Sequence, residues 1–499
     1  MERTHHARGL GALIIDIVAV AAATLMGCSS DSAPAQAVPV ETPNDVSAAE
    51  AGAPPVAVAA PDAAAQDAAP TPMPYRPKMS DLIGSNGWPY TDSAMTAWQM
   101  MGLGWGRNEV GPGQPMSASD PMDVTKTTGG ADLGSIILKN NVSGVRTLIL
   151  LAYTAPWNGL VPGDSHSAPA DVTPWKNYVE AVVTRYSAAP YNVKYFQIWN
   201  EAAGSLSGGS PQATFWHGPG PSNLPYANAM VDYVDRVHIP AAKIIRSHNA
   251  YVVYGGWPDQ GGLDTYSTWL EYMSAVHGAR MLDWVDYLDL HYLGVNEEDT
   301  LHTRYMSSGK IRGIWQTEIG DGYMVNQNYL PQYYFDNAIW ALGHGWDDRD
   351  KYVSMIYHWE GTEPFRLTAR DGTFNPSGRS LVTLRATLPG FLAPFDHAIT
   401  ASAGLTAKAL YSDDKIVFLV VGKPGAHSIT VGDVAVPASN HWKVDYIDGV
   451  EGTPVPGASP FSSWQGKALA VQFDVPGPKN DVQGNPRDYL GYVVVTPLP

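Results

Sequence analysis

The sequence predicts an α/β fold followed by an all-β region, and three observations support this. Short apolar runs alternate with helical patterns from Leu82 to about Phe391, an order typical of parallel strands joined by helices. Beyond Phe391 the helical patterns stop, and strand-like runs continue between Gly and Pro residues. Hydrophobic residues make up 44% of the 499 residues and charged residues 16%, so most of the chain is expected to fold.

The first region fits a (β/α)8 TIM barrel, predicted to span residues 76–390. Eight apolar runs have the length and composition of buried strands, and helical segments lie between them. The clearest helix follows Thr173 and Pro174, a capping residue and a proline at the first helical position. The predicted strands are Leu82–Ser85, Leu103–Asn108, Val145–Tyr153, Tyr195–Asn200, Tyr251–Gly255, Tyr287–Tyr292, Gly313–Glu318 and Tyr352–Trp359.

The second region, residues 391–499, is predicted to be a small antiparallel β-sandwich. Two strand-like runs flank the turn residues Ser412, Asp413 and Asp414, which is a hairpin signal. The predicted strands are Ala407–Tyr411, Lys415–Val421, His427–Val431, His441–Ile447, Ala468–Val475 and Tyr489–Thr496.

The first 75 residues are expected to carry targeting information rather than a fold. Arg3 and Arg8 precede an apolar segment that ends in Leu25-Met26-Gly27-Cys28, and this resembles a bacterial lipoprotein signal peptide with its lipobox. The resemblance implies cleavage before Cys28 and lipidation of that residue. Residues 29–75 are rich in Ala, Pro, Asp and Ser, so they are predicted to be a disordered linker.

Charge and cysteine usage exclude several classes of function. The formal net charge of −17 argues against binding to nucleic acid or to an anionic membrane surface. A lone cysteine allows neither an intrachain disulfide nor a thiolate metal cage. The sequence contains no His-Glu-x-x-His motif and no EF-hand loop, and no glycine-rich phosphate loop follows a predicted strand. We therefore expect neither a metal nor a cofactor.

Two predicted strands end on a carboxylate. Glu201 follows the fourth strand directly, and Glu318 closes the seventh. Strict alternation along the seventh strand from Glu318 predicts that Trp315 faces the helices. The carboxyl ends of the strands of a parallel barrel meet at one face, where active sites are built. Two carboxylates brought together there are the groups needed to cleave a glycosidic bond.

The barrel region resembles clan A of the glycoside hydrolases, the retaining (β/α)8 enzymes. In that clan an Asn-Glu pair ends the fourth strand and a second Glu ends the seventh, as Asn200-Glu201 and Glu318 do here. The β-sandwich and the second and third strands are most similar to family 39 and related endoglycosidases, although Ala202 replaces the proline of many relatives. Further segments that carry the resemblance are 101–109, 150–157, 253–256, 291–292 and Trp359.

The resemblance implies a role for each site residue. Glu201 is expected to be the acid/base, protonated at rest, and Glu318 the ionised nucleophile. Either Tyr292 or His291 is expected to contact Glu318, and Tyr292 is preferred. The other implied substrate-binding or supporting residues are Asn200, which would donate to the sugar 2-hydroxyl, Arg107, which would support the nucleophile, and Trp359, which would lie beneath the sugar.

Tryptophans at strand ends are candidate sugar platforms, because flat rings suit sugar faces, although each could equally fill the core. The candidates are Trp88, Trp157 and Trp257, with Trp359. Spread around the barrel mouth, they would line a groove suited to endo-type cleavage. A long glycine-rich segment, 202–221, could instead close one end for exo-type action. Glu109, in a second Asn-Glu pair, is expected to be a rim residue or a secondary sugar contact.

The sequence therefore predicts a retaining O-glycosidase acting on a β-linked polysaccharide or oligosaccharide by double displacement. The expected location is extracytoplasmic, either held by the lipid anchor at the outer membrane or cell surface, or secreted. The alternative is a surface lipoprotein that binds carbohydrate and has lost turnover. An esterase is a third possibility, but Gly163-Asp164-Ser165-His166 lacks the closing glycine of a serine hydrolase motif.

Overall fold

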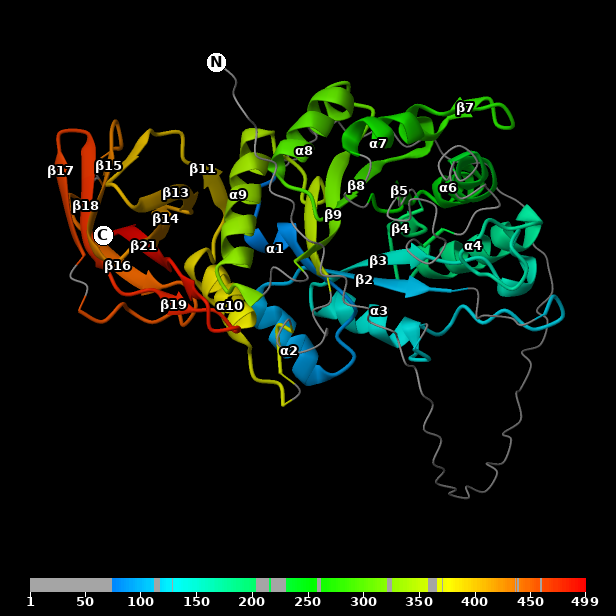
Figure 1. The fold of residues 1–499 in the computed structure, drawn as a ribbon, viewed down its shortest axis with the longest axis horizontal. Helices are drawn as coiled ribbons and strands as arrows, with labels where there is room; N and C mark the ends of the chain where they lie inside the picture. The colour runs from blue at the N-terminus through cyan, green and yellow to red at the C-terminus, as the bar shows by residue number, and fades with distance from the viewer. Residues whose placement is uncertain are drawn as a thin grey trace, which may run out of the picture. The chain divides into compact units, whose positions relative to one another are not determined.

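A computed structural model of the chain (Figure 1) describes most residues from position 74 onward. Cys28, the predicted signal peptide and nearly all of the predicted linker lie outside the described residues, as does Trp359. None of the helices described here is long and apolar enough to cross a membrane. The described residues are 74–111, 117–127, 129–202, 215–216, 230–257, 262–320, 325–357, 366–369, 371–435, 437, 439–457 and 460–499.

Eight parallel strands close into a barrel in the order β1-β10-β9-β8-β5-β4-β3-β2, which confirms the predicted fold class. Each of the eight strands expected from the sequence is present. The short strands β6 (Met273–Ser274) and β7 (Ala279–Arg280) form a separate two-stranded sheet. The barrel strands are β1 (Ile83–Asn86), β2 (Trp105–Val110), β3 (Arg146–Leu151), β4 (Tyr195–Ile198), β5 (Tyr251–Val253), β8 (Tyr287–His291), β9 (Gly313–Gly320) and β10 (Tyr352–Tyr357).

Helices lie between successive barrel strands and surround them (Figure 1). The α-helices are α1 (Met79–Leu82), α2 (Asp92–Met101), α3 (Leu133–Val142), α4 (Val172–Ser187), α6 (Ile239–Ser247), α7 (Gly262–Glu271), α8 (Val295–Leu301), α9 (Tyr329–Gly343) and α10 (Pro376–Thr387). Short 3₁₀ or π segments are η1 (Pro156–Asn158), η3 (Tyr233–His238), η4 (Met281–Trp284) and η5 (His302–Met306).

Helix α4 forms where the sequence pattern predicts a helix, but its start differs. The side chain of Asp171 caps the helix by accepting from the backbone N–H of Thr173 at 2.9 Å, so the predicted cap at Thr173 is wrong by two residues. Pro174 then falls in the first turn, where its missing N–H leaves no helical bond unmade. The buried apolar face of α4 consists of Trp175, Tyr178, Val179, Val182, Val183 and Tyr186.

The amino-terminal half of the barrel interior is filled by an aromatic layer. The ring of Trp315 lies 4.9 Å from that of Trp105, 5.2 Å from that of Tyr195 and 4.8 Å from that of Tyr287, measured between centroids. These residues come from different strands, so their rings meet inside the barrel. The expectation that Trp315 faces the helices is therefore wrong.

A bulge explains the error in orienting Trp315. Leu290 on β8 pairs with Gln316 on β9, but His291 pairs with Glu318, so Thr317 is an extra residue on β9. The expectation relied on strict alternation along the strand from Glu318. The bulge breaks this alternation, and both Trp315 and Glu318 face the barrel interior.

The C-terminal region consists of antiparallel sheets, as predicted. A five-stranded sheet has the order β11-β13-β14-β21-β16 and a four-stranded sheet the order β12-β15-β18-β17; β19 pairs with β20. The hairpin at Asp413 joins β13 to β14. The strands are β11 (Leu392–Pro394), β12 (Ile399–Ala401), β13 (Leu405–Ser412), β14 (Lys415–Gly422), β15 (Gly425–Val431), β16 (Trp442–Asp448), β17 (Phe461–Gln465), β18 (Ala468–Val475), β19 (Lys479–Asn480), β20 (Pro486–Arg487) and β21 (Tyr489–Pro497).

Strand β14 serves two apolar cores. Phe418 and Val420 belong to a cluster formed within the C-terminal sheets. Their neighbours Val417 and Leu419 point to the opposite face and belong to the apolar cluster that also contains the helices of the barrel. Because successive side chains of β14 point to opposite faces, the five-stranded sheet packs against the C-terminal cluster on one face and against the barrel helices on the other. Three polar contacts reinforce this junction: Lys408 with Asp336, the Asn328 amide donating to Asp488 O at 2.8 Å, and Thr383 donating to Val450 O at 2.9 Å.

Candidate active site

The two glutamates meet at the carboxyl ends of β4 and β9. A carboxylate oxygen of Glu201 lies within 4.8 Å of one of Glu318. Both residues are buried, with 8% of Glu201 and 5% of Glu318 exposed. The barrel therefore places two carboxylates in one site from segments 117 residues apart in sequence (318 − 201).

The backbone that turns Glu201 into the site adopts an uncommon conformation. Trp199 has φ of 69° and Glu201 has φ of 44°, both in the left-handed region. Two backbone bonds hold this turn: Trp199 N–H donates to Leu151 O at 3.0 Å and Glu201 N–H to Gly255 O at 2.7 Å. Each such residue costs on the order of 1–3 kcal/mol, and strain of this kind is concentrated at functional sites.

Arg107 is the hub of the site and is 4% exposed. Its Nη1 donates to Glu318 Oε1 at 2.8 Å and its Nη2 to Asn200 Oδ1 at 2.6 Å. Because an arginine can only donate, the oxygen of Asn200 must face Arg107, and the amide NH2 is turned away from it. The remaining contacts of the guanidinium are Nη1 with Asn86 Oδ1 at 2.5 Å and Nε with Gln197 Oε1 at 2.6 Å.

Glu318 is held in its ionised form. Burial would raise the pKa of its carboxyl, but the positive charges of His291 and Arg107 outweigh burial and lower the pKa below its usual value. Hydrogen bonds from Arg107 and Tyr292 act in the same direction. The Tyr292 hydroxyl donates to Glu318 Oε2 at 2.9 Å, the contact preferred from the sequence.

His291 contacts both glutamates. Its Nδ1 lies 2.7 Å from Glu201 Oε1 and 3.6 Å from Glu318 Oε2, and the ring is fully buried. Burial would lower the pKa of His291, but the charge of Glu318 and the hydrogen bonds with Asp289 and Glu201 raise it to about 10. A Cβ at position 256 would collide with this ring, so Gly256 gives the histidine its space.

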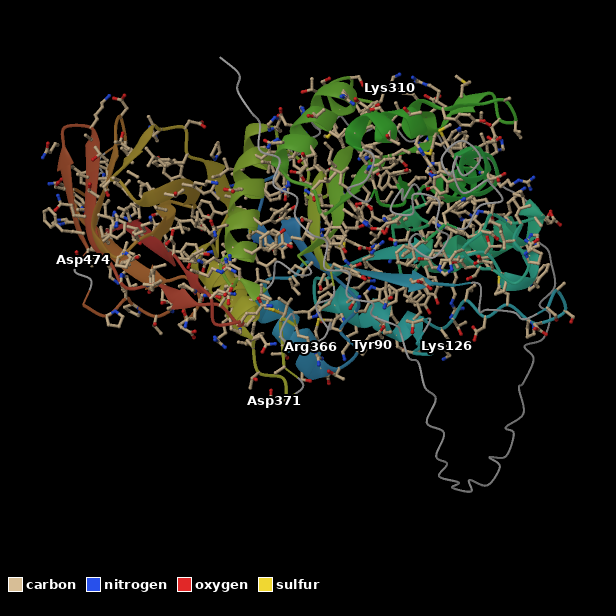
Figure 2. The ribbon with its side chains drawn as sticks, in the orientation of Figure 1. Tyr90, Lys126, Lys310, Arg366, Asp371 and Asp474 are labelled. Carbon is tan, nitrogen blue, oxygen red and sulfur yellow. The ribbon has the colours of Figure 1, made fainter. Side chains whose placement is uncertain are left out.

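A hollow of about 200 Å³ opens onto Glu318. Tyr153 and Phe215 stack in parallel on one side, with ring centroids 6.3 Å apart. Tyr90, labelled in Figure 2, contacts one of the lining residues: its hydroxyl accepts a hydrogen bond from the Asn108 side chain at 2.9 Å. The lining residues are Asn86, Gly87, Arg107, Asn108, Glu109, Leu150, Tyr153, Asn200, Phe215, Glu318 and Tyr357. Glu109 is thus part of this lining.

The tryptophan platforms expected from the sequence are only partly available. Trp257 is fully buried against Tyr266 and Trp269, so its ring has no face open to a sugar, and Trp88 is fully buried as well. Both residues therefore fill the core, which is the alternative that the sequence left open, and do not provide sugar platforms. Trp157 is 37% exposed on η1. The glycine-rich segment 202–221 lies almost entirely outside the described residues, as does Trp359.

Several residues of the site were not singled out from the sequence. Asn86, Gln197, Asp289 and Thr317 all take part in the polar network around Arg107 and His291. Gln197, Asp289 and Thr317 are polar residues inside apolar strand runs, each two positions beyond a residue of the aromatic layer. This regular offset of two is the signal that could have identified them.

A metal ion is one possible occupant of the cluster Glu201, His291 and Glu318, since their ligand atoms lie within 4.8 Å of one another. However, His291 Nδ1 and Glu201 Oε1 are only 2.7 Å apart. Ligands at about 2.1 Å around a tetrahedral ion are more than about 3 Å apart. Arg107 also supplies positive charge to Glu318 already. The arrangement therefore fits a hydrogen-bonded group better than a metal centre.

No protein-family model matches the sequence, and no curated protein matches it. Solved structures do share its fold. A GH30 endoxylanase from Clostridium papyrosolvens C71 has a TM-score of 0.52 and 15% identity, covering 85% of this chain and 97% of that chain. A family 39 glycoside hydrolase from Bacteroides cellulosilyticus WH2 has a TM-score of 0.52 and 13% identity, covering 84% and 82%.

A family 30 subfamily 8 xylanase from Clostridium acetobutylicum has a TM-score of 0.53 and 11% identity, covering 83% of this chain and 95% of that chain. At such identities the likenesses show the fold alone. They share the expected architecture, a (β/α)8 barrel, and each of these three proteins is itself described as a glycoside hydrolase or a xylanase.

Proposed function

We propose that the protein is a retaining glycoside hydrolase that cleaves a β-linked polysaccharide or oligosaccharide. The observation that carries the proposal is the pair of buried carboxylates, Glu201 and Glu318, with oxygens within 4.8 Å of each other beside a hollow. Retaining enzymes hold their carboxyl groups about 5–5.5 Å apart, whereas inverting enzymes leave about 6.5–9.5 Å for a water molecule. The short separation supports double displacement.

The surroundings of the two carboxylates support different roles for them. Glu318 receives donors from Arg107 and Tyr292, and the lowered pKa keeps it ionised. An ionised carboxylate can attack the anomeric carbon and form a glycosyl-enzyme intermediate. We assign Glu201 to protonate the departing oxygen and then to accept a proton from the water that hydrolyses the intermediate.

Asn200 and the hollow support the proposed sugar contacts. Because Asn200 Oδ1 faces Arg107, its NH2 is free to donate to a sugar hydroxyl. In retaining enzymes, a hydrogen bond to the 2-hydroxyl strengthens in the transition state. The parallel rings of Tyr153 and Phe215 supply apolar surface for a sugar face. We assign these groups to hold the ring that is attacked.

The choice of a β-linked polymer rests on the neighbours. Two of the structures that share the fold are described as an endoxylanase and a xylanase. We also propose that Cys28 is lipidated and that the enzyme acts outside the cytoplasm, a proposal that rests on Leu25-Met26-Gly27-Cys28. A Cys28→Ser variant that stays in membrane fractions at an unchanged mature size would contradict the lipid anchor.

A panel of β-linked polysaccharides with product sizing tests the activity, and NMR of the first products reports the anomeric configuration. The expected result is hydrolysis with initial release of the β-anomer. Glu318→Gln is the control for contaminating activity. Initial release of the α-anomer would contradict retention. Tight binding of a polymer without turnover would instead identify a carbohydrate-binding protein.

A further inference from the structure

A buried chain of hydrogen bonds runs beneath the two glutamates, and its direction is fixed from Arg107. Arg107 Nε donates to Gln197 Oε1 at 2.6 Å, and an arginine cannot accept. The amide of Gln197 is therefore oriented with its NH2 on the opposite side. This NH2 donates to Asp289 Oδ2 and to Tyr254 O, the latter at 3.1 Å.

Asp289 is fully buried and receives donors on both oxygens. The backbone N–H of Thr317 donates to Oδ1 at 2.9 Å, and the Thr317 hydroxyl donates to Oδ2 at 2.7 Å. A hydroxyl has one proton and two lone pairs. With its proton directed to Asp289, the Thr317 oxygen can only accept from other neighbours.

His291 is the neighbour that faces this oxygen, with Nε2 3.0 Å from Thr317 Oγ1. Because Thr317 can only accept there, Nε2 must carry a proton. Without a proton on Nε2, a lone pair of this nitrogen would face a lone pair of Thr317 Oγ1 in a fully buried position, which is unfavourable. The other ring nitrogen, Nδ1, lies 2.7 Å from Glu201 Oε1, so these two atoms share one further proton.

We propose that Asp289 and Thr317 are positioning residues that fix the His291 tautomer, so that the proton needed by the acid/base is held between Nδ1 and Glu201. This proposal rests on the proposed function for the role of Glu201, but the tautomer itself follows from the contacts alone. The proton can move to the leaving group through Glu201, and the pair regains one proton from the attacking water. No proton is lost over the cycle.

The charges that face His291 support a tightly held proton. Glu201 lies 2.7 Å, Glu318 3.6 Å and Asp289 3.7 Å from the ring nitrogens. Arg107 and Tyr292 lie beyond Glu318 and bind its oxygens. The pKa of His291, raised to about 10, indicates that the pair keeps its proton well above neutral pH. The fall of kcat/KM at alkaline pH should therefore report the loss of this proton.

The first test uses Thr317→Val, which keeps the shape and removes the hydroxyl, with Thr317→Ser as the matched control. In full-length protein, Thr317→Val should move the alkaline limb of the kcat/KM profile to lower pH by about one unit, the size expected for one hydrogen bond to a charged group. Thr317→Ser should restore it. An unchanged limb in Thr317→Val, or an equal shift in both variants, would overturn the proposal.

The second test does not depend on turnover. Nitrogen-15 NMR of the histidines in the full-length protein distinguishes the tautomers, and the signals of His291 are identified by their loss in His291→Gln. We expect Nε2 to stay protonated in the neutral ring, above the alkaline limb. A ring protonated on Nδ1 with a bare Nε2 would refute the tautomer. If no substrate is hydrolysed, the proposed function fails, and this measurement still decides the inference.

Discussion

The two ends of the barrel interior differ in chemistry although the same strands build them. On four strands, one inward side chain is aromatic, and the side chain two positions further on is polar. The pairs are Trp105 and Arg107 on β2, Tyr195 and Gln197 on β4, Tyr287 and Asp289 on β8, and Trp315 and Thr317 on β9. We call these levels the aromatic layer and the polar layer, and we include in the polar layer Glu201, His291 and Glu318, which belong to the same hydrogen-bonded network.

The difference shows how stability and chemistry are separated within one barrel. The aromatic layer buries large rings, whose removal from water stabilises the fold. The polar layer contributes less to folding stability, because its hydrogen bonds within the protein largely replace the hydrogen bonds that the same groups make with water in the unfolded chain. The polar layer instead orients the two carboxylates, to which the proposed function assigns opposite protonation states. Changes in the first layer should therefore affect stability, and changes in the second should affect activity.

Glu318→Gln gives the largest expected loss in the polar layer. An amide cannot attack the anomeric carbon, so turnover should fall below detection on every substrate. Folding should persist, because glutamine keeps the shape of the side chain. Initial rates and circular dichroism of the same preparation check both points. Wild-type turnover in this variant would remove the proposed enzyme function.

Glu201→Ala should cause a loss that depends on the substrate. General acid catalysis contributes roughly 10²–10⁴-fold, and a good leaving group needs little of it. Rates on aryl glycosides with leaving groups of different pKa, compared between this variant and wild type, measure the dependence. Equal losses across the series would contradict the assignment of Glu201 as the acid.

Trp315→Ala tests the aromatic layer. Removing a fully buried tryptophan should destabilise the protein by about 3–5 kcal/mol, measured by denaturant unfolding. The activity of the molecules that remain folded should change much less than in Glu318→Gln. Val276→Ala is the control, because Val276 is 71% exposed and its truncation should be nearly neutral. A large loss of activity without destabilisation would erase the distinction between the layers.

The polar layer should also make stability depend on pH. The pKa of His291 is raised from 6.5 to about 10, so its contribution is fully present below about 6.5 and is lost as pH rises through about 10. The slope is at most about 1.4 kcal/mol per pH unit in that range. Urea unfolding of wild type and His291→Gln across these pH values checks it, and equal slopes would contradict the shift.

Glu318 contributes with the opposite sign. Its pKa lies below the ordinary value of 4.5, so its stabilisation is present above that value and is lost as pH falls. The polar layer as a whole should therefore contribute most between about 4.5 and 6.5.

The smallest effect is expected at Trp157, which is partly exposed on η1, the segment that follows β3. If its ring stacks on substrate, Trp157→Ala should raise KM by about 2–10-fold, the size of one aromatic contact. The matched change Trp257→Phe alters a fully buried ring and should leave KM unchanged. Equal KM values for wild type and Trp157→Ala would remove Trp157 from the substrate site.

The sequence predicts the barrel well because its strands are short, largely apolar runs separated by helical patterns. Glu201 and Glu318 stand out because each ends such a run. Trp315 was placed on the wrong side because a bulge adds Thr317 to β9, and a bulge leaves no mark in hydrophobic periodicity. For Trp257 the sequence left a sugar platform and a core position open, because its side chain lies beyond the end of β5 at Val253, and the structure buries its ring fully.

Polar residues within strands were harder to find than those at strand ends. Gln197 and Asp289 lie among apolar neighbours, and in a sequence such positions are easily taken as isolated exceptions. The role of each depends on a partner in another strand: Gln197 accepts from Arg107, and Asp289 accepts from Thr317. Only the closed barrel brings these partners together, so local pattern could not reveal the network.

Strand β14 has a consequence for the modularity of the chain. Val417 and Leu419 complete the apolar cluster of the barrel helices, while Phe418 and Val420 complete that of the C-terminal sheets. Cutting the chain near Phe391 would remove Val417 and Leu419 from the apolar cluster of the barrel helices and expose that apolar surface to water. The C-terminal sheets are therefore not an independent domain that can be removed without destabilising the barrel. The two parts should melt in a single transition and be inherited, swapped or engineered as one unit.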